Sequence, residues 1–480
     1  LNPSGPLPSG AETNGWSSDP AQSILSQPQG SRGFAPVGIE GDFYLKEISV
    51  SGSGASALDL SAGASTVMYS GGLIHDGGSG PMIRVQDWTA SIRLRGGPFG
   101  AIGGQAVFLS GADGGFTSEV PIFASPTLPP PSPPLSRGPV LAEEPQTTGV
   151  VEVRNCLGNV AFSGLDLTSS ALSGLVIIGN TGVVSNEPGS SPVGSSSTLP
   201  DQAPATGNSI TTTGHPAVEI WDSPIYLTFN EVSALTPLHH GILLSNATGL
   251  FQAAGGSIVN PIPGVWTPYG VESGPLFAPQ PTTGLALLVV EGNPDVFYGG
   301  AIVNTDPATA PGVWSLGMGG TLGGSVVFGG PIEDSGYGIM LSGRLETGVL
   351  GSNVRFEGGL TLTGAGFGGT APFTVSGPAI VSVSQEGTPS RIPLPPSDGM
   401  IEVVGSGNTV TPPVGVPAID IQDVDIGPDG VAFQTVSSDG AGTGITLKNT
   451  GEGPFKITGT DDVEESGGLI FNSVGDGVLI

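Results

Sequence analysis

Short alternations of apolar and polar residues recur along most of the chain. Each reads apolar-x-apolar-x followed by Asn, Asp or Gly, as in Ile83, Val85 and Asp87. Alternation at period two places the apolar side chains on one face of a strand. Asn, Asp and Gly are the residues that tolerate a left-handed backbone with little strain. Each copy therefore predicts a short strand with one buried face, followed by a sharp bend.

The copies are spaced as in a coiled repeat. The bend positions differ by 24 residues between 87 and 111, by 25 between 155 and 180, and by 26 between 423 and 449. About 25 residues hold three short strands and three turns, which is one coil of a parallel β-helix with a rise of ~4.8 Å. Strands this short are stable only when stacked on neighbouring repeats. The further copies are Val107, Leu109 and Gly111; Val151, Val153 and Asn155; Val176, Ile178 and Asn180; Val218, Ile220 and Asp222; Ile242, Leu244 and Asn246; Leu288, Val290 and Gly292; Ile339, Leu341 and Gly343; Ile401, Val403 and Gly405; Ile419, Ile421 and Asp423; Ile445, Leu447 and Asn449; and the start of another copy at Val478 and Ile480.

A second motif, Gly-Gly-x-Ile followed by one residue and then Asp or Asn, occurs five times. Its copies are GGLIHD (71–76), GGSIVN (255–260), GGAIVN (299–304), GGPIED (329–334) and GGLIFN (467–472). Together the two motifs predict an all-β fold, a right-handed parallel β-helix. We expect it to span residues 46–480 in roughly 15 coils, after an N-terminal segment, 1–45, that is rich in Pro, Gly and Ser.

Four Pro-rich stretches lengthen the spacing between copies, at 120–148, 185–213, 261–283 and 387–398. Each falls just before an alternating strand, so we expect all of them to leave from the same edge of the helix. Their Pro content favours extended, polyproline-like conformations. They are either passive decoration or a row of contact loops. Trp266 and Tyr269, in the third stretch, are candidate contacts for assembly or for stacking on sugars.

Composition excludes several classes of protein. The 82 Gly and 45 Pro, without helix-forming runs, argue against helices, and 37% hydrophobic residues argue against disorder. With a net charge of −29, nucleic-acid binding is not expected. The sequence contains no run of about 18 apolar residues, so no membrane span is predicted. The single cysteine, Cys156, rules out an intrachain disulfide and leaves the redox compartment open.

The bend pattern and the unit GGLIFNSVGDGVLI (467–480) resemble the right-handed parallel β-helix repeats of bacterial surface and secreted proteins. Autotransporter passengers and filamentous-haemagglutinin-like adhesins belong to that group. The resemblance covers residues 45–480 as a pattern. It implies export from the cell and a ladder of stacked side chains at one turn, which in this chain draws on Asn155, Asn180, Asn246 and Asn449.

Enzymes that cleave acidic polysaccharides also use this fold. Polygalacturonase-like motifs occur as NTD at 304–306, HHG at 239–241 and DD at 461–462, but in the wrong order and too far apart. Hydrolysis needs two carboxylates within ~5–10 Å of one bond. Arg93 and Arg95 alternate with apolar residues, as on the outer face of a strand, rather than forming the basic centre of a lyase. We therefore expect no catalytic residues.

We expect no cofactor, and calcium is the one candidate. DVDIGPDG (423–430) supplies Asp423, Asp425 and Asp429, and DDVEE (461–465) supplies Asp461 and Asp462. Carboxylates closely spaced in a turn are ligands of the kind that calcium prefers. For the first group a half-buried strand explains the spacing equally well.

The sequence thus favours a non-catalytic, extracellular or cell-surface protein with a structural or adhesive role. Open strand edges favour self-assembly into filaments, a sheath or a surface layer, so the expected partner is a second copy of the chain. The alternative is a β-helix that binds or degrades polysaccharide. Polysaccharide or a cell surface is the other candidate partner.

Overall fold

The computed structural model describes most of the repeat region. The described residues are 23–27, 43–46, 48–52, 56–76, 80–97, 99–102, 104–125, 148–186, 208–262, 284–306, 313–319, 324–342, 353–376, 379–383, 389–393, 399–460, 463–464 and 466–480. They form two compact units, Leu1–Asn230 and Glu231–Ile480, which are described separately. No helix in the described residues is long and apolar enough to cross a membrane.

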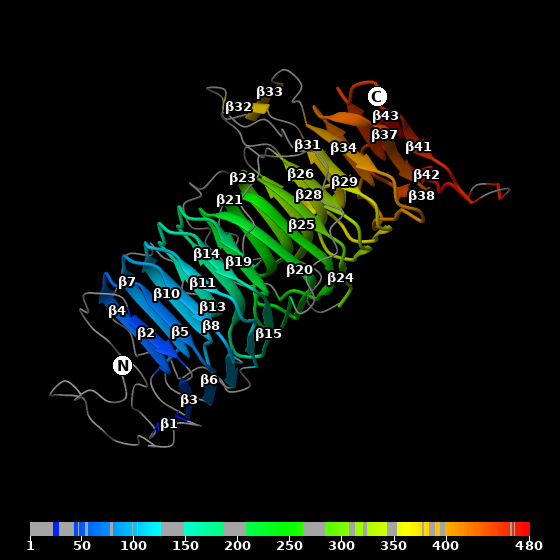
Figure 1. Cartoon of the computed structure of the whole chain (residues 1–480). Helices are drawn as coiled ribbons and strands as arrows, with labels where there is room; N and C mark the ends of the chain where they lie inside the picture. Colours follow the sequence, from blue (N-terminus) through cyan, green and yellow to red (C-terminus); the bar gives the residue numbers. More distant parts are fainter. Residues whose placement is uncertain are drawn as a thin grey trace. The chain divides into compact units, whose positions relative to one another are not determined.

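Unit 1, Leu1–Asn230, is built from three faces of parallel strands, and within each face every strand pairs with the equivalent strand of the next coil (Figure 1). The first face contains β4 (Leu58–Gly63), β7 (Ile83–Trp88), β10 (Val107–Ala112), β13 (Gly149–Arg154), β16 (Ser173–Ile178) and β19 (Val218–Trp221). The second contains β2 (Phe43–Lys46), β5 (Val67–Ser70), β8 (Ile92–Arg95), β11 (Phe116–Ser118), β14 (Val160–Phe162), β17 (Val184–Ser185) and β20 (Pro224–Leu235). The third contains β1 (Ser23–Gln27), β3 (Ile48–Gly52), β6 (Leu73–Asp76), β9 (Phe99–Ile102), β12 (Ile122–Ala124), β15 (Leu165–Ser169) and β18 (Ser209–Thr213).

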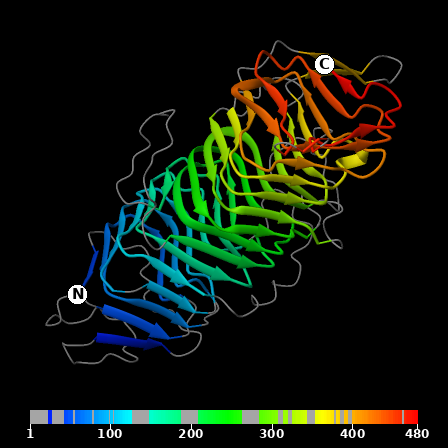
Figure 2. The same ribbon diagram turned by 90° about the vertical axis from the view of Figure 1, so that its right-hand side faces the viewer.

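Unit 2, Glu231–Ile480, repeats the arrangement, and Figure 2 shows its strands stacked in parallel from green to red. Its first face contains β21 (His240–Gly255), β23 (Gly284–Tyr298), β25 (Val313–Gly319), β28 (Gly338–Ser342), β31 (Phe373–Ser376), β36 (Ile419–Gln422), β40 (Ile445–Lys448) and β43 (Val478–Leu479). The second continues from the end of β23 through β26 (Ser325–Phe328), β29 (Asn353–Phe356), β34 (Met400–Val403), β37 (Asp425–Phe433) and β41 (Phe455–Ile457). The third contains β22 (Ser257–Val259), β24 (Ala301–Asn304), β27 (Ile332–Asp334), β30 (Leu360–Leu362), β35 (Thr409–Val410) and β38 (Thr435–Val436).

Three smaller elements complete unit 2. β39 (Ser438–Asp439) pairs in parallel with β42 (Ile470–Phe471). A short 3-10 helix, η1, spans Phe367–Gly369. β32 (Ala379–Val383) and β33 (Pro389–Pro393) form an antiparallel hairpin between β31 and β34. The hairpin includes part of the expected insertion at 387–398, whereas 126–147, 187–207 and 263–283 of the other three lie outside the described residues. The expectation that all four leave from one edge is wrong, as their flanking strands show. The first and third insertions connect a third-face strand to a first-face strand, the second connects β17 of the second face to β18 of the third, and the hairpin lies between β31 of the first face and β34 of the second.

The all-β expectation is confirmed, with parallel pairing as the rule. The alternating apolar residues point inward and are buried, so each unit has a continuous apolar core. In unit 2 the core includes aromatic rings in contact with one another: Phe328 and Phe356 are stacked, whereas Phe373 and Phe433 meet edge to face. The ring centres are 5.2 Å apart for Phe328 and Phe356, and 5.5 Å apart for Phe373 and Phe433.

The GGxI motif has a steric cause in unit 2. In the copies at 255–260, 299–304 and 329–334, the second glycines lie in register at the bend between the second and third faces, and Gly358 continues this column. A Cβ added to Gly330 would lie 2.0 Å from the carbonyl oxygen of Gly300, and one on Gly358 would lie 1.9 Å from that of Gly330. In GGLIFN (467–472), a Cβ on the second glycine, Gly468, would instead lie 2.1 Å from the carbonyl oxygen of Val436. Only glycine lets the backbones approach this closely. GGLIHD differs, because the residue that packs inward there is Leu73, whereas Ile74 faces outward.

Three of the predicted copies are wrong in register. β16 packs Leu175 and Ile177 inward, in line with Val151 and Val153 of β13. The residue at the bend is therefore Gly179, with φ +63°, and not Asn180. In β23 the residues equivalent to Ile242 and Leu244 are Leu287 and Val289.

The third wrong copy lies on another face. Ile401 and Val403 belong to β34 in the second face, and Gly405 stacks at the glycine bend on Gly358. The spacing of 18 residues from 405 to 423 is irregular for that reason. The first-face strands missing from the predicted series include β31, whose Phe373 and Val375 pair with Ile419 and Ile421.

Candidate functional site

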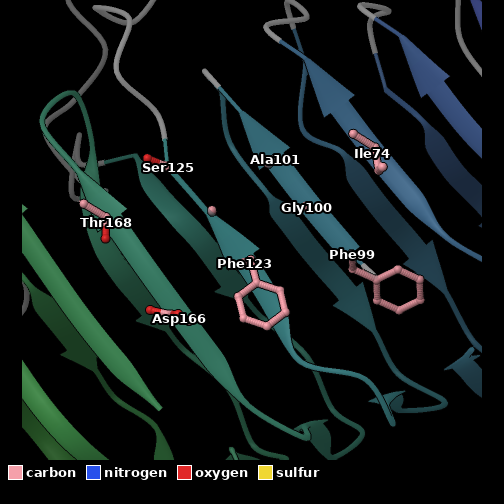
Figure 3. Close-up of a pocket in the computed structure, with 9 residues that line it drawn as sticks. Ile74, Phe99, Gly100, Ala101, Phe123, Ser125, Asp166 and Thr168 are labelled. Atoms are coloured by element: carbon pink, nitrogen blue, oxygen red, sulfur yellow. The ribbon is translucent and has the colours of Figure 1, made fainter. Parts of the chain in front are cut away.

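A hollow of about 390 Å³ lies on the outer surface of the third face of unit 1 (Figure 3). It crosses β6, β9, β12 and β15, and its size falls within the ~300–1,000 Å³ that is usual for ligand clefts. It is lined by Ile74, Phe99, Gly100, Ala101, Phe123, Ala124, Ser125, Asp166 and Thr168. Of these strands, β6 falls in the GGLIHD motif, whereas β12 lies in a stretch that was expected to be a Pro-rich insertion (120–148). The sequence did not indicate a hollow.

The apolar part of the hollow follows from strand register. Ile74 pairs with Gly100, and Gly100 pairs with Phe123, so the three lie in a row across the strands. The side chains of Ile74 and Phe123 are 42% and 45% exposed, although both residues are large and apolar. A Cβ on Gly100 would have no atom within 4 Å, so the space above Gly100, between the side chains of Ile74 and Phe123, is empty.

The polar part continues the same register. Phe123 pairs with Asp166 of β15, and Asp166 pairs with Ser209 of β18. The Ser209 hydroxyl donates a 2.6 Å hydrogen bond to Oδ1 of Asp166, which orients the carboxylate and leaves Oδ2 as an acceptor. Ser125 and Thr168 supply hydroxyls at the same edge, and Figure 3 shows them beside Asp166 and Phe123. The hollow therefore offers an aromatic ring next to hydrogen-bonding groups.

The first group of candidate calcium ligands is dispersed among other partners. Oδ1 of Asp423 accepts a 2.7 Å hydrogen bond from Nδ2 of Asn449. Oδ2 of Asp429 lies 2.5 Å from Nη1 of Arg355. Asp425 lies in β37 between the buried Val424 and Ile426, as a half-buried strand requires. In the described part of the chain, no three His, Cys, Asp or Glu side chains are grouped closely enough to hold a metal ion.

Other candidates lie outside the described residues. They are Asp461 and Asp462 of the second calcium group, and the loop aromatics Trp266 and Tyr269.

The candidate turn residues occupy two different positions. Asn155, Asn246 and Asn449 adopt left-handed φ values of 50°, 48° and 51° at the bend after the first face. Asn180, one position beyond the bend, is buried. Its Oδ1 accepts a 2.8 Å hydrogen bond from the backbone N–H of Cys156, in the preceding coil. Side-chain links between coils therefore exist, and the contact between Asn449 and Asp423 is another.

No known protein helps to interpret these sites. No family model, curated protein or solved structure matches the chain.

A buried carboxylate in unit 2 was not foreseen from the sequence. Oδ1 of Asp334 accepts hydrogen bonds of 2.7 and 2.9 Å from the backbone N–H groups of Gly336 and Gly338. Its Oδ2 accepts one of 2.9 Å from Nδ2 of Asn304, and another from the hydroxyl of Ser315. Burial raises the pKa of Asp334, and these hydrogen bonds oppose the rise. Asn304, which opens the NTD motif, thus serves this internal contact.

Two further ionisable groups are explained by packing. Arg355 of β29 pairs with Glu357, Glu402 and Asp429 on the outer surface of the second face of unit 2, and these contacts raise the pKa of Arg355. Burial raises the pKa of the Cys156 thiol to about 11. A buried thiol that stays protonated at neutral pH is a poor nucleophile.

Proposed function

We propose that the chain is a non-catalytic, extracellular structural or adhesive protein, built as a right-handed parallel β-helix. The observation that supports the proposal is the stacking of each face from coil to coil over an apolar core. Such stacking extends a rigid surface with only local contacts between repeats, which suits a scaffold. Asp334, Asp423, Asp429 and Arg355 are satisfied by structural partners.

The handedness rests on a general rule. Connections that join parallel strands within one sheet are right-handed in about 98% of known cases. Consecutive strands of the first face, such as β7 and β10, are parallel neighbours joined through strands of the other two faces. A right-handed coil is therefore the expected path of the chain.

Self-assembly is supported by the last described strands of unit 2. β41, β42 and β43 pair in parallel with β37, β39 and β40, respectively. Their surroundings carry exposed apolar side chains. These are Ile457, Leu469, Phe471, Val474, Val478 and Leu479. Exposed apolar side chains grouped in one region mark a surface for contact with another chain, and we propose that the partner is a second copy.

Sedimentation velocity over a range of concentrations tests the assembly. We expect concentration-dependent association of the wild-type chain, and rods or sheets in electron micrographs. Phe471→Lys and Val478→Lys should each reduce association, because a charge at the strand edge opposes pairing. Leu157→Lys is the matched control, since Leu157 is also exposed and apolar but lies in unit 1. A wild-type chain that remains a single monomeric species would overturn the proposal.

One observation favours the alternative, polysaccharide binding. The hollow in unit 1 combines an exposed aromatic ring with hydroxyl and carboxylate groups, which is the chemistry that holds sugars. Its lining includes one carboxylate, Asp166, whereas glycoside hydrolysis generally uses two. The hollow is therefore better suited to holding a sugar than to cleaving one.

A further inference from the structure

The outer surface of the third face of unit 1 is apolar at one end and hydroxyl-rich at the other. The row formed by Ile74, Gly100 and Phe123 is apolar, and Asp166 and Ser209 continue it on the next two strands. A second row contains Thr168, which pairs with Thr211. Because neighbouring strands are ~4.8 Å apart, both rows present groups at a regular spacing.

A ligand that fits this surface must itself be amphiphilic and repetitive. Pyranose rings carry C–H groups on their faces and hydroxyls around their edges, and a glycan chain repeats both along its length. One sugar face can pack on the Phe123 ring, in the empty space above Gly100. Sugar hydroxyls can then donate to Oδ2 of Asp166 and exchange hydrogen bonds with Ser125 and Thr168.

Charge selects among glycans. The chain carries a net charge of −29, and the one charged group in the lining of the hollow is the Asp166 carboxylate. An acidic polysaccharide would be repelled both over long range and at the site. We propose that this hollow binds a segment of a neutral glycan, with Phe123 as the stacking platform and Asp166, held by Ser209, as the main hydrogen-bond acceptor. This inference rests on the proposed adhesive role and specifies its ligand.

Binding to immobilised and soluble neutral polysaccharides tests the inference, with β-glucan, xyloglucan and galactomannan as probes and polygalacturonate as the acidic comparison. We expect the wild-type chain to bind at least one neutral probe and not the acidic one. Phe123→Ala should weaken that binding roughly tenfold, through loss of the aromatic contact. Asp166→Asn should weaken it as well, while leaving the apolar contact in place.

Gly100→Leu provides a second variant that does not depend on removing a contact. A side chain there projects into open space, so the fold should be retained while the hollow is filled. We expect loss of binding with unchanged circular dichroism. Leu157→Ala, which removes an exposed apolar side chain elsewhere in unit 1, should bind like the wild type.

Three outcomes would overturn the inference: no binding to any neutral probe, binding to the acidic probe alone, or wild-type affinity in both Phe123→Ala and Gly100→Leu. The assembly test is independent of these results. Phe471→Lys should retain glycan binding, and Phe123→Ala should sediment like the wild type. Failure of one proposal is therefore distinguishable from failure of the other.

Discussion

At the scale of single residues, Asp334 shows how the interior of unit 2 accommodates a carboxyl group. Four donors surround it, two of them backbone N–H groups within four residues of its own position. Hydrogen bonds favour the charged form, whereas burial penalises it. Burial is the larger effect, so the pKa of Asp334 is raised above its ordinary value of 3.8.

The raised pKa predicts a pH dependence of stability. The folded state holds the proton at pH values where the unfolded state has released it, so folding becomes less favourable as the pH rises above 3.8 and through the folded pKa. Asp334→Asn removes this titration. We expect the difference in the free energy of unfolding between wild type and variant to shift against the wild type from acidic to neutral pH.

Urea unfolding of both proteins at a series of pH values measures this shift. Taking the difference cancels the titration of the other carboxylates, which the two proteins share. A difference that is constant across the series would show that Asp334 does not change its protonation within it.

Two of the bend residues that sequence alone placed correctly follow strands in which polar and apolar residues alternate. Asn155 follows β13, and Asn449 follows β40, where Thr446 and Lys448 mark the outer side. In β16 all six residues are buried, so Leu175, Val176, Ile177 and Ile178 give no contrast between faces. Period-two alternation specifies the register only where one face is polar. The bend was therefore placed at Asn180 rather than at Gly179.

The candidate site was missed for a related reason. An aromatic residue at an outward position of a short strand was the available signal, and Phe123 between Ile122 and Ala124 is such a residue. Its significance depends on Gly100 and Ile74, which lie on strands of the two preceding coils. Only the register between coils brings these residues together. The aromatic residues predicted from the sequence as candidate contacts were instead Trp266 and Tyr269, in a Pro-rich stretch.

At the scale of elements, the glycine bend explains why GGxI recurs where it does. Gly256, Gly300, Gly330 and Gly358 lie in register between the second and third faces of unit 2. Each leaves room for the carbonyl group of the coil before it. The sequence showed the motif, and the stacked backbones supply its physical reason.

Gly330→Ala should therefore destabilise unit 2. The added methyl group would lie 2.0 Å from the carbonyl oxygen of Gly300, which is backbone and cannot move alone. We expect a loss of about 1–3 kcal/mol, as for other overpacked sites, seen as a lower melting temperature by calorimetry.

Gly442→Ala is the matched control, because a Cβ there would meet no atom within 4 Å. Equal melting temperatures for the two variants would contradict the steric explanation of the motif.

At the scale of the whole molecule, charge is the dominant property. Forty-one acidic residues face twelve basic ones, and several of the basic residues are held in ion pairs. Arg93 and Arg95 share Glu119 in unit 1, and Arg355 has three acidic neighbours in unit 2. The remaining negative charge is uncompensated and opposes the compact state.

Added salt should therefore stabilise the chain. Raising the ionic strength from ~10 mM to ~150 mM shortens the screening length from about 30 Å to about 8 Å. We expect melting temperatures to rise by a few degrees, through weaker self-repulsion. A fall would mean that the ion pairs around Glu119 and Arg355 outweigh the repulsion.

Calcium chloride at matched ionic strength extends the same experiment. A larger increase in melting temperature with calcium than with sodium or magnesium would support calcium binding by carboxylates such as those of Asp461 and Asp462. Equal rises would indicate screening alone.

The hairpin formed by β32 and β33 carries a consequence for how such a chain can change. It leaves the stack after β31 and the chain returns by β34, while β31 still pairs with β36 in unbroken register from Phe373↔Ile419 to Ser376↔Gln422. Extra sequence at that junction thus leaves the pairing of the neighbouring strands unchanged. The entropic cost of closing a longer loop grows only slowly with its length. We therefore expect unit 2 to accept a grafted epitope or a foreign hairpin in place of residues 379–393, so that it would serve as a scaffold for displaying peptides.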